Sequence, residues 1–223
     1  MTNGEFPRPE RAIVDRLARL PTATIANALD DVGKMVNCPV ALRPVAPGMA
    51  FAGLAITVEV IAADAGRYTS ADFRVGAMID AALAGDVIVV SAQGARSSIF
   101  GGMASLAAKV KGIAGLVVDG GVRDIDEMVA HQFPVFARHT VATTGRTRLK
   151  VNAINAPIEV DGVMVKPCDV IVADSTGIVV VPRGEAGRVA ELAEGYAHDD
   201  ATAEKEIRAG LSFSEAMAKF KRI

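Results

Sequence analysis

The sequence predicts a mixed α/β fold that ends in a helical tail, and three observations support this fold class. Short apolar runs bounded by Gly, Pro or Asp are typical of strands, and most of them are continuous, which indicates strands covered on both faces. Amphipathic stretches lie between these runs, so the middle third of the chain alternates strand and helix. After residue 182 the pattern indicates helices alone.

Six strands are expected, at Leu54–Ile61, Val87–Val90, Gly115–Val118, Val135–Ala137, Val170–Ala173 and Ile178–Val181. Three core-facing helices are expected. The first passes through Ile25, Leu29 and Val32, with Thr22 and Thr24 as candidate caps and Gly33 at its end. The second lies at Ala71–Leu83, and the third, at Met103–Val110, is expected to turn Met103, Leu106, Ala107 and Val110 to the core.

The tail is expected to hold two helices. Glu185–Tyr196 is amphipathic, and a capping box from Ser212 to Glu215 opens a second helix after a charged stretch. We therefore expect one α/β domain over residues 1–182 and a helical tail over residues 183–223. The tail is either a solvated face or an arm that reaches a neighbouring subunit.

Composition excludes several classes of protein. With 223 residues, 51% of them apolar, and a net charge of −2, the chain can bury a sizeable core and is not expected to be disordered. Lys and Arg do not outnumber Asp and Glu, and Trp is absent, which argues against a nucleic acid partner. No apolar run reaches the roughly 18 residues of a membrane helix. Cys38 and Cys168 lack metal-ligand spacing, and we expect a cytoplasmic protein with no membrane partner.

The segment of residues 100–127 carries the residues best suited to chemistry. Gly101-Gly102 opens a helix, where unpaired backbone N–H groups can bind a small anion. A strand and an expected turn at Asp119-Gly120-Gly121 follow, and Arg123 and Asp124 then precede the next helix. Arg123 suits a carboxylate held by two parallel hydrogen bonds, and Asp124 suits a hard divalent cation.

A purely structural interpretation competes with this one. Asp124 also fits the N-cap position of a helix, with Glu127 as the acid three positions further on. This capping role would explain both acids without a metal. The histidines His131, His139 and His198 show no ligand spacing, so a zinc site is not expected. No nucleophile elbow, phosphate-binding loop or dinucleotide fingerprint is present.

Most of the chain resembles one family, through the stretches PTATIANALDDVG, RPVAPGMAFAGLAITVEV, GGMASLAAKVKGIAGLVVDGGVRDIDE, FPVFAR and VKPCDVIVADSTGIVVVP. This family contains the class II pyruvate aldolases that cleave 4-hydroxy-4-methyl-2-oxoglutarate and 4-carboxy-4-hydroxy-2-oxoadipate. It also contains the non-enzymatic regulator of ribonuclease E activity A. The resemblance implies a swivelling β/β/α fold, homotrimers or homohexamers, and active sites in clefts between subunits.

The family motif is an acid, twenty intervening residues, Arg-Asp, and a second acid three positions after that Asp. Arg123, Asp124 and Glu127 match it, whereas Gly102 stands where the first acid is expected. The resemblance implies that Asp124 and waters hold Mg²⁺ or Mn²⁺ and that Arg123 pairs with a 2-oxo acid.

The rest of the implied site comes from two other parts of the sequence. Around Gly101 and Gly102, the backbone amides of Met103 and Ala104 are expected to bind the substrate's C1 carboxylate. Support for the metal is expected from Glu127 or from tail carboxylates of a neighbouring chain, for which the candidates are Asp199, Asp200 and Glu204.

The expected function is a divalent-metal-dependent lyase that cleaves a 4-hydroxy-2-oxo acid to release pyruvate. Oxaloacetate decarboxylase activity should accompany it, because loss of CO₂ from oxaloacetate forms the same enolate. Two alternatives stay open at this stage: a non-catalytic, protein-binding regulator, and a lyase that acts on a different 2-oxo acid.

Overall fold

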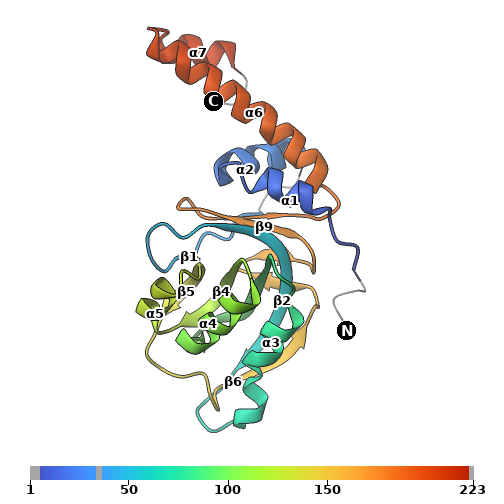
Figure 1. The fold of residues 1–223 in the computed structure, drawn as a ribbon, viewed down its shortest axis with the longest axis vertical. Helices are drawn as coiled ribbons and strands as arrows, with labels where there is room; N and C mark the ends of the chain where they lie inside the picture. Colours follow the sequence, from blue (N-terminus) through green and yellow to red (C-terminus); the bar gives the residue numbers. More distant parts are fainter. Residues whose placement is uncertain (1–5, 34–36, 221–223) are drawn as a thin grey trace.

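The protein is a mixed α/β fold, described here as a computed structural model over residues 6–33 and 37–220 (Figure 1). Its main sheet has eight strands, which lie in the spatial order β1 (Arg43–Pro44), β5 (Val135–Thr140), β4 (Gly115–Val122), β3 (Asp86–Phe100), β2 (Phe51–Ala62), β9 (Val170–Ala173) and β10 (Ile178–Val181), with β6 (Leu149–Ile154) also paired to β2. The hairpin of β7 (Ile158–Val160) and β8 (Val163–Val165) forms a second, small sheet. All six expected strands are confirmed.

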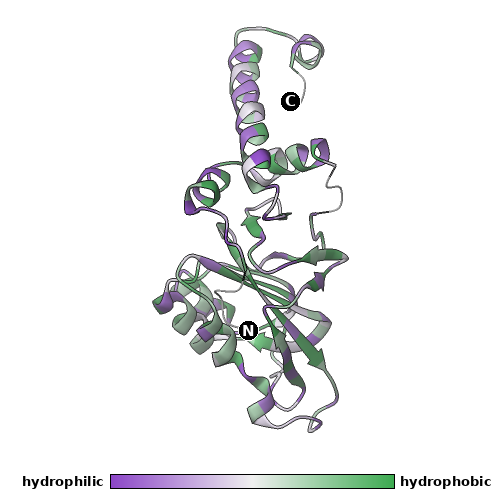
Figure 2. Cartoon of the chain, turned by 90° about the vertical axis from the view of Figure 1, so that its right-hand side faces the viewer, coloured by the Kyte–Doolittle hydropathy of each residue, from purple (hydrophilic) through white to green (hydrophobic). Residues whose placement is uncertain are grey.

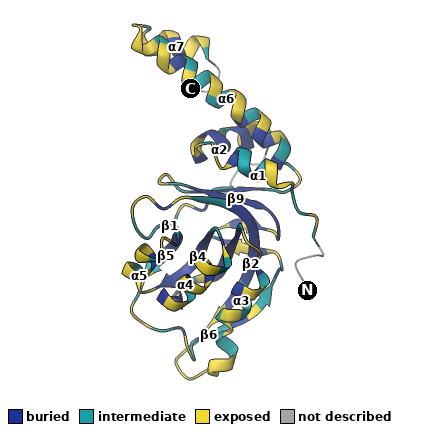
Figure 3. Cartoon of the chain, viewed as in Figure 1, coloured by how far each residue is buried: buried dark blue, intermediate teal, exposed yellow. Residues whose placement is uncertain are grey.

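Strands β2 to β5 run parallel, and β1, β6, β9 and β10 pair antiparallel with their neighbours. Three short helices, α3 (Val75–Ala81), α4 (Gly102–Lys111) and α5 (Ile125–Ala130), cover one face of the parallel strands (Figure 1). The core on that face includes Met78, Ala108 and Met128 from the helices. The strands therefore have little exposed surface, as Figure 3 shows.

A third layer covers β9 and β10. Helices α1 (Arg11–Leu17), α2 (Thr22–Asp31) and the first half of α6 (Ala186–Arg208) enclose a separate apolar cluster with these strands. The second half of α6 and the helix α7 (Phe213–Lys219) extend away from the sheet (Figures 1 and 2). The capping box from Ser212 to Glu215 is confirmed at the start of α7, whereas the predicted domain boundary after residue 182 stays a prediction.

Two local predictions are corrected. The stretch Ala71–Leu83 is not one helix, because a capping box between Thr69 and Asp72 starts a separate 3-10 helix, η1 (Ser70–Phe73), before α3. At α2 the threonines do not cap the helix; instead the N–H and hydroxyl of Thr22 donate to the carboxylate of Asp174.

Helix α4 is also turned differently from the prediction. Met103 and Val110 are 76% and 80% exposed and Leu106 is 38% exposed, although their spacing predicted a core-facing stripe. The small residues Gly102, Ser105 and Ala108 face the sheet instead, because they allow the helix to lie close to it. The Ser105 hydroxyl is satisfied there by the Gly102 carbonyl, at 2.6 Å. The apolar stripe of α4 is therefore left on the surface.

Within residues 6–33 and 37–220, no helix combines the length and apolar character needed to cross a bilayer.

Candidate active site

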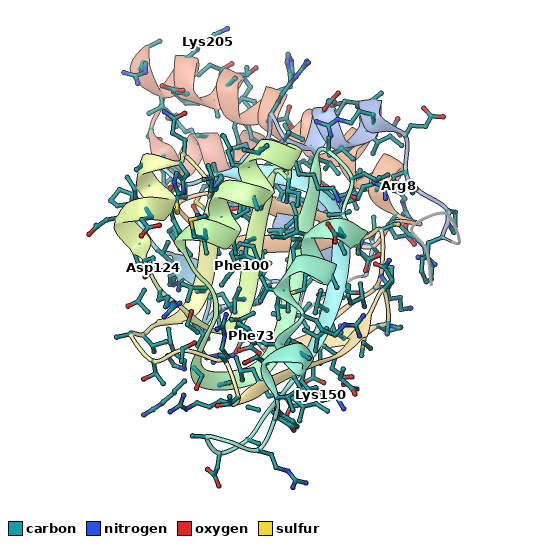
Figure 4. The ribbon with its side chains drawn as sticks, turned by 60° about the horizontal axis from the view of Figure 1, so that its bottom comes forward. Arg8, Phe73, Phe100, Asp124, Lys150 and Lys205 are labelled. Atoms are coloured by element: carbon teal, nitrogen blue, oxygen red, sulfur yellow. The ribbon has the colours of Figure 1, made fainter. Side chains whose placement is uncertain are left out.

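The carboxyl ends of β3 and β4 open into a cavity of about 460 Å³, called the main cavity below. Four parts of the chain line it: the η1–α3 corner, the end of β3 with the first turn of α4, the junction of β4 and α5, and the loop before β6. Figure 4 shows Phe73, Phe100 and Asp124 in this region, from three of those parts. The seven candidate residues from the segment 100–127 all line the cavity: Gly101, Gly102, Met103, Ala104, Arg123, Asp124 and Glu127.

Asp124 does not cap its own helix with its side chain. It is the N-cap residue of α5, but its backbone is left-handed, with φ 59° and ψ 47°, a conformation that costs most L-residues about 1–2 kcal/mol. Its Oδ2 instead accepts from the N–H of Gly102, at 3.0 Å. The capping interpretation is therefore wrong for the side chain: Asp124 is the N-cap residue of α5, but its carboxylate accepts a hydrogen bond at the start of α4. Its carboxylate lies in the cavity as a result.

Glu127 lies against the same helix start. A Cβ added to Gly102 would stand 1.7 Å from Glu127 Oε2 and 2.4 Å from its Cδ, so the carboxylate occupies the space of a side chain at position 102. Any larger residue at position 102 would have to displace Glu127. Glycine at the motif's first position therefore leaves the space that the carboxylate of Glu127, the motif's second acid, occupies.

Gly101 makes room for the other two charged groups. A Cβ there would stand 2.6 Å from Asp124 Oδ2 and 3.3 Å from Nε of Arg123. The guanidinium Nε lies 3.5 Å from Asp124 Oδ2, and both side chains are about two-fifths exposed, at 44% and 39%. Arg123 is therefore oriented by a carboxylate while its guanidinium stays accessible to an anion.

The first turn of α4 supplies hydrogen-bond donors to the cavity. The N–H of Ser105 is bonded to the carbonyl of Gly101, whereas helix geometry leaves the N–H groups of Met103 and Ala104 without intrahelical acceptors. Unpaired N–H groups at a helix start, together with the helix dipole, favour a bound anion. A carboxylate of a small acid fits this place.

The tail carboxylates do not join the cavity within one chain. Asp199, Asp200 and Glu204 lie on α6, which projects from the other side of the fold (Figure 1). Glu204 is paired with Arg208 one helical turn on. Burial raises the pKa of Asp200 above its ordinary value, and the neighbouring charge of Asp199 adds to this effect.

The predicted turn at Asp119-Gly120-Gly121 is wrong, because β4 continues to Val122. Asp119 is buried and ion-paired with Arg138, and it lines a different pocket. The two glycines serve close strand packing: a Cβ on Gly120 would stand 2.9 Å from Ile99, and one on Gly121 2.7 Å from Val141.

Sequence reasoning missed one wall of the cavity. Arg74 follows η1 and Arg146 lies in the loop before β6. Both line the cavity, although neither belongs to the segment 100–127. No local motif marks these residues, because only the tertiary fold brings them to the site.

The fold and cavity together define an α/β protein with a cavity at the carboxyl edge of parallel strands, where ligands of such sheets usually bind. The chain belongs to the RraA-like family, described as Aldolase/RraA, which matches residues 22–180.

Three similar proteins illustrate this membership. A protein of Halalkalibacterium halodurans named "Putative 4-hydroxy-4-methyl-2-oxoglutarate aldolase" is 33% identical over 195 residues, which are 87% of this chain and 88% of that protein. The structure of an uncharacterized protein from Pseudomonas syringae has a TM-score of 0.85 at 27% identity and covers 95% of this chain and 99% of the other. Streptomyces coelicolor RraAS2, described as an unusual member of the RNase ES inhibitor RraA family, has a TM-score of 0.78 at 27% identity, with 90% and 98% covered.

Proposed function

We propose that this chain is a divalent-metal-dependent lyase of the class II aldolase type. It cleaves a 4-hydroxy-2-oxo acid, releases pyruvate, and also decarboxylates oxaloacetate. The observation that carries the proposal is that Arg123, Asp124 and Glu127 line one cavity at the start of α4. Family membership and the name of the Halalkalibacterium relative support it.

The carboxylates present fit Mg²⁺ or Mn²⁺. Mg²⁺ usually takes one or two protein carboxylates and keeps several waters, and Asp124 and Glu127 offer two. In the described part of the chain, no three His, Cys, Asp or Glu side chains are grouped to hold a metal, so the remaining ligands would come from water, substrate or a second chain. When bound, such a cation supplies Lewis-acid stabilisation of negative charge on the substrate's keto oxygen.

The chain's own residues bind and orient the substrate. The N–H groups of Met103 and Ala104 receive its C1 carboxylate at the start of α4. Arg123 donates to the 2-oxo acid and stabilises the negative charge that develops as the carbon–carbon bond breaks. Asp124 holds Arg123 in place through the 3.5 Å contact between Oδ2 of Asp124 and Nε of Arg123.

We further propose that the protein assembles as a homotrimer or homohexamer. The stripe of Met103, Leu106 and Val110 leaves apolar surface exposed next to the cavity, and such a patch is typical of an interface. A neighbouring chain at this face could bring a tail carboxylate to the site. Asp199 and Asp200 suit this role better than Glu204, which Arg208 already pairs.

The test is a panel of 4-hydroxy-2-oxo acids and oxaloacetate, assayed for pyruvate with Mg²⁺ and again after chelation. We expect metal-dependent pyruvate release that Asp124→Asn abolishes and Asp126→Asn retains; Asp126 is an exposed acid on the same helix and does not line the cavity. If no acid of the panel yields pyruvate with metal, the proposal is wrong and a non-catalytic, protein-binding role is favoured.

A further inference from the structure

We infer that a second cavity, on the face of the sheet opposite to α3, α4 and α5, binds a small organic ammonium compound. This cavity, called the hairpin pocket below, has a volume of about 490 Å³ and lies between the main sheet and the β7–β8 hairpin. From the main sheet, strands β2 to β5 line it with Glu59, Ser91, Gln93, Asp119 and Arg138. The hairpin lines its other side. The ammonium compound would bind here whether or not the main cavity is a lyase site.

The alternation of side chains along β3 separates the hairpin pocket from the main cavity. Val90 belongs to the core under the helices, whereas Val89 belongs to the core under the hairpin. Because successive side chains of a strand point to opposite faces, Ser91 also faces the hairpin. The register pairs Ser91 with Glu59 on β2 and with Asp119 on β4, so these three polar residues form one row across the sheet.

The hydroxyl of Ser91 is available to a ligand. Ser91 is 5% exposed and lines the hairpin pocket. Among residues 6–33 and 37–220, its side chain makes no hydrogen bond, whereas the buried hydroxyls of Thr57 and Ser105 each donate to a carbonyl at 2.6 Å. Buried polar groups in proteins are nearly always hydrogen-bonded. An unpartnered hydroxyl that faces a cavity therefore indicates a polar group bound there.

The lining of the hairpin pocket has an excess of negative charge. It contains four carboxylates and one guanidinium, those of Glu59, Asp119, Glu159, Asp161 and Arg138. The guanidinium binds both aspartates, whose other oxygens accept backbone N–H groups. In the described part of the chain, neither glutamate has an ion-pair partner. Such a lining attracts a cation and repels the acids proposed for the main cavity.

The groups that remain free favour an organic ammonium over a metal ion. No three His, Cys, Asp or Glu side chains are grouped to hold a metal within residues 6–33 and 37–220. An ammonium group requires only hydrogen-bond acceptors, and Ser91 and Glu59 supply two of them from neighbouring positions of the row. Ile158 and Met164 add apolar surface that suits methylene groups. An aliphatic diamine, with its second ammonium left for Glu159, matches this combination of charge and apolar surface.

The test uses methionine methyl signals, because Met164 lines the hairpin pocket and Met103 lines the main cavity. In NMR spectra of protein labelled at the methionine methyl groups, 1,4-diaminobutane should shift the Met164 signal in a saturable manner and leave the Met103 signal in place. Met164→Leu and Met103→Leu assign the two signals. Butane-1,4-diol, which has the same chain without the charges, should shift neither. Raising NaCl from about 20 to about 200 mM should weaken diamine binding at least about threefold.

Two conservative variants test the residues. Glu59→Gln should weaken binding of 1,4-diaminobutane by about tenfold and Ser91→Ala by about threefold, because each removes one acceptor of the ammonium group. Both variants leave the ion pair of Asp119 and Arg138 in place, so the melting temperature should change little. Asp126→Asn is the matched control for the loss of one negative charge and should leave the affinity unchanged, since Asp126 lines neither cavity.

Several outcomes would overturn the inference. These are a Met164 signal that the diamine does not shift, one that the diol shifts equally, and unchanged diamine affinity in either Glu59→Gln or Ser91→Ala. Displacement of the diamine by an equal concentration of Mg²⁺ or Ca²⁺ would identify a metal site instead and would also overturn it. None of these measurements depends on pyruvate release, so the lyase proposal and the ammonium site succeed or fail separately.

Discussion

The carboxylate of Glu127 occupies the volume that a side chain at Gly102 would need, with Oε2 1.7 Å from the position of the absent Cβ. Two residues that lie twenty-five positions apart in sequence are thus alternatives for one place at the start of α4. Glycine in the motif's first position thus leaves room for Glu127, which with Asp124 gives the cavity two carboxylates.

A substitution cycle tests this relationship through metal affinity. Glu127→Gln should weaken Mn²⁺ binding by about tenfold, because one of two cavity carboxylates is lost. Glu127→Ala should weaken binding equally, and the double variant Gly102→Asp/Glu127→Ala should recover most of the affinity, because alanine, unlike glutamine, vacates the volume into which the new carboxylate returns. Calorimetry with Mn²⁺ alone gives the readout, with Asp126→Asn as control; unchanged affinity in Glu127→Gln would refute the idea.

Arg123→Lys should lower kcat/KM for pyruvate release by about a hundredfold although the charge is kept. Lysine cannot reproduce the two parallel hydrogen bonds of a guanidinium to a carboxylate. The melting temperature should stay near that of the unaltered protein, because the Arg123 side chain is 44% exposed and its one ion-pair contact is 3.5 Å long. Arg96→Lys serves as the matched control. Near-normal turnover by Arg123→Lys would remove the arginine from the proposed mechanism.

Val110→Glu should dissociate the assembly. The Val110 side chain is 80% exposed on the stripe of α4, and a buried, unpaired carboxylate at an interface is strongly unfavourable. Light scattering after size-exclusion chromatography should show a smaller mass for this variant. Met164→Glu, at a residue 52% exposed on β8, should leave the mass unchanged. Equal masses for the unaltered protein, Val110→Glu and Met164→Glu would show that the interface does not lie on the exposed face of α4.

Asp161→Asn should destabilise the fold at neutral pH. Hydrogen bonds from the backbone N–H of Ala41, and further bonds from Arg138 and Val40, outweigh burial and hold the pKa of Asp161 below its ordinary value. A carboxylate with a lowered folded-state pKa stabilises the fold above its unfolded-state pKa of about 3.9, and this contribution is lost as the pH falls through the folded-state value.

The expected loss in the free energy of unfolding is about 1–2 kcal/mol at pH 7. Urea unfolding should show that the difference in the free energy of unfolding between the unaltered protein and Asp161→Asn becomes smaller below about pH 4. Asparagine tolerates the left-handed backbone of Asp161, at φ 50°, so the comparison tests the carboxylate and its accepted hydrogen bonds without backbone strain. Glu159→Gln, an exposed acid of the same hairpin, should show no such change. A loss in the free energy of unfolding that is the same at every pH would contradict the stabilising role of the ionised Asp161 carboxylate.

The strands could be predicted because their signal is local. Continuous apolar runs such as Val170–Ala173 coincide with strands covered on both faces, and the cavity residues of the segment 100–127 fall in two short groups, within 101–104 and 123–127. The orientation of α4 could not be predicted. Its apolar spacing indicated a buried stripe, but the sheet selects the small residues Gly102, Ser105 and Ala108 for close packing.

The sequence alone determined the fold class and the strands, because each depends on neighbours within a few residues, and the motif resemblance indicated that Arg123 and Asp124 lie near the start of a helix twenty residues earlier. The tertiary structure decided that Glu127 fills the volume at Gly102, that Asp124 bonds to α4 rather than to its own helix, and that Arg74 and Arg146 complete the cavity. These relationships join segments far apart along the chain, and their distances are set by packing, which no local pattern records.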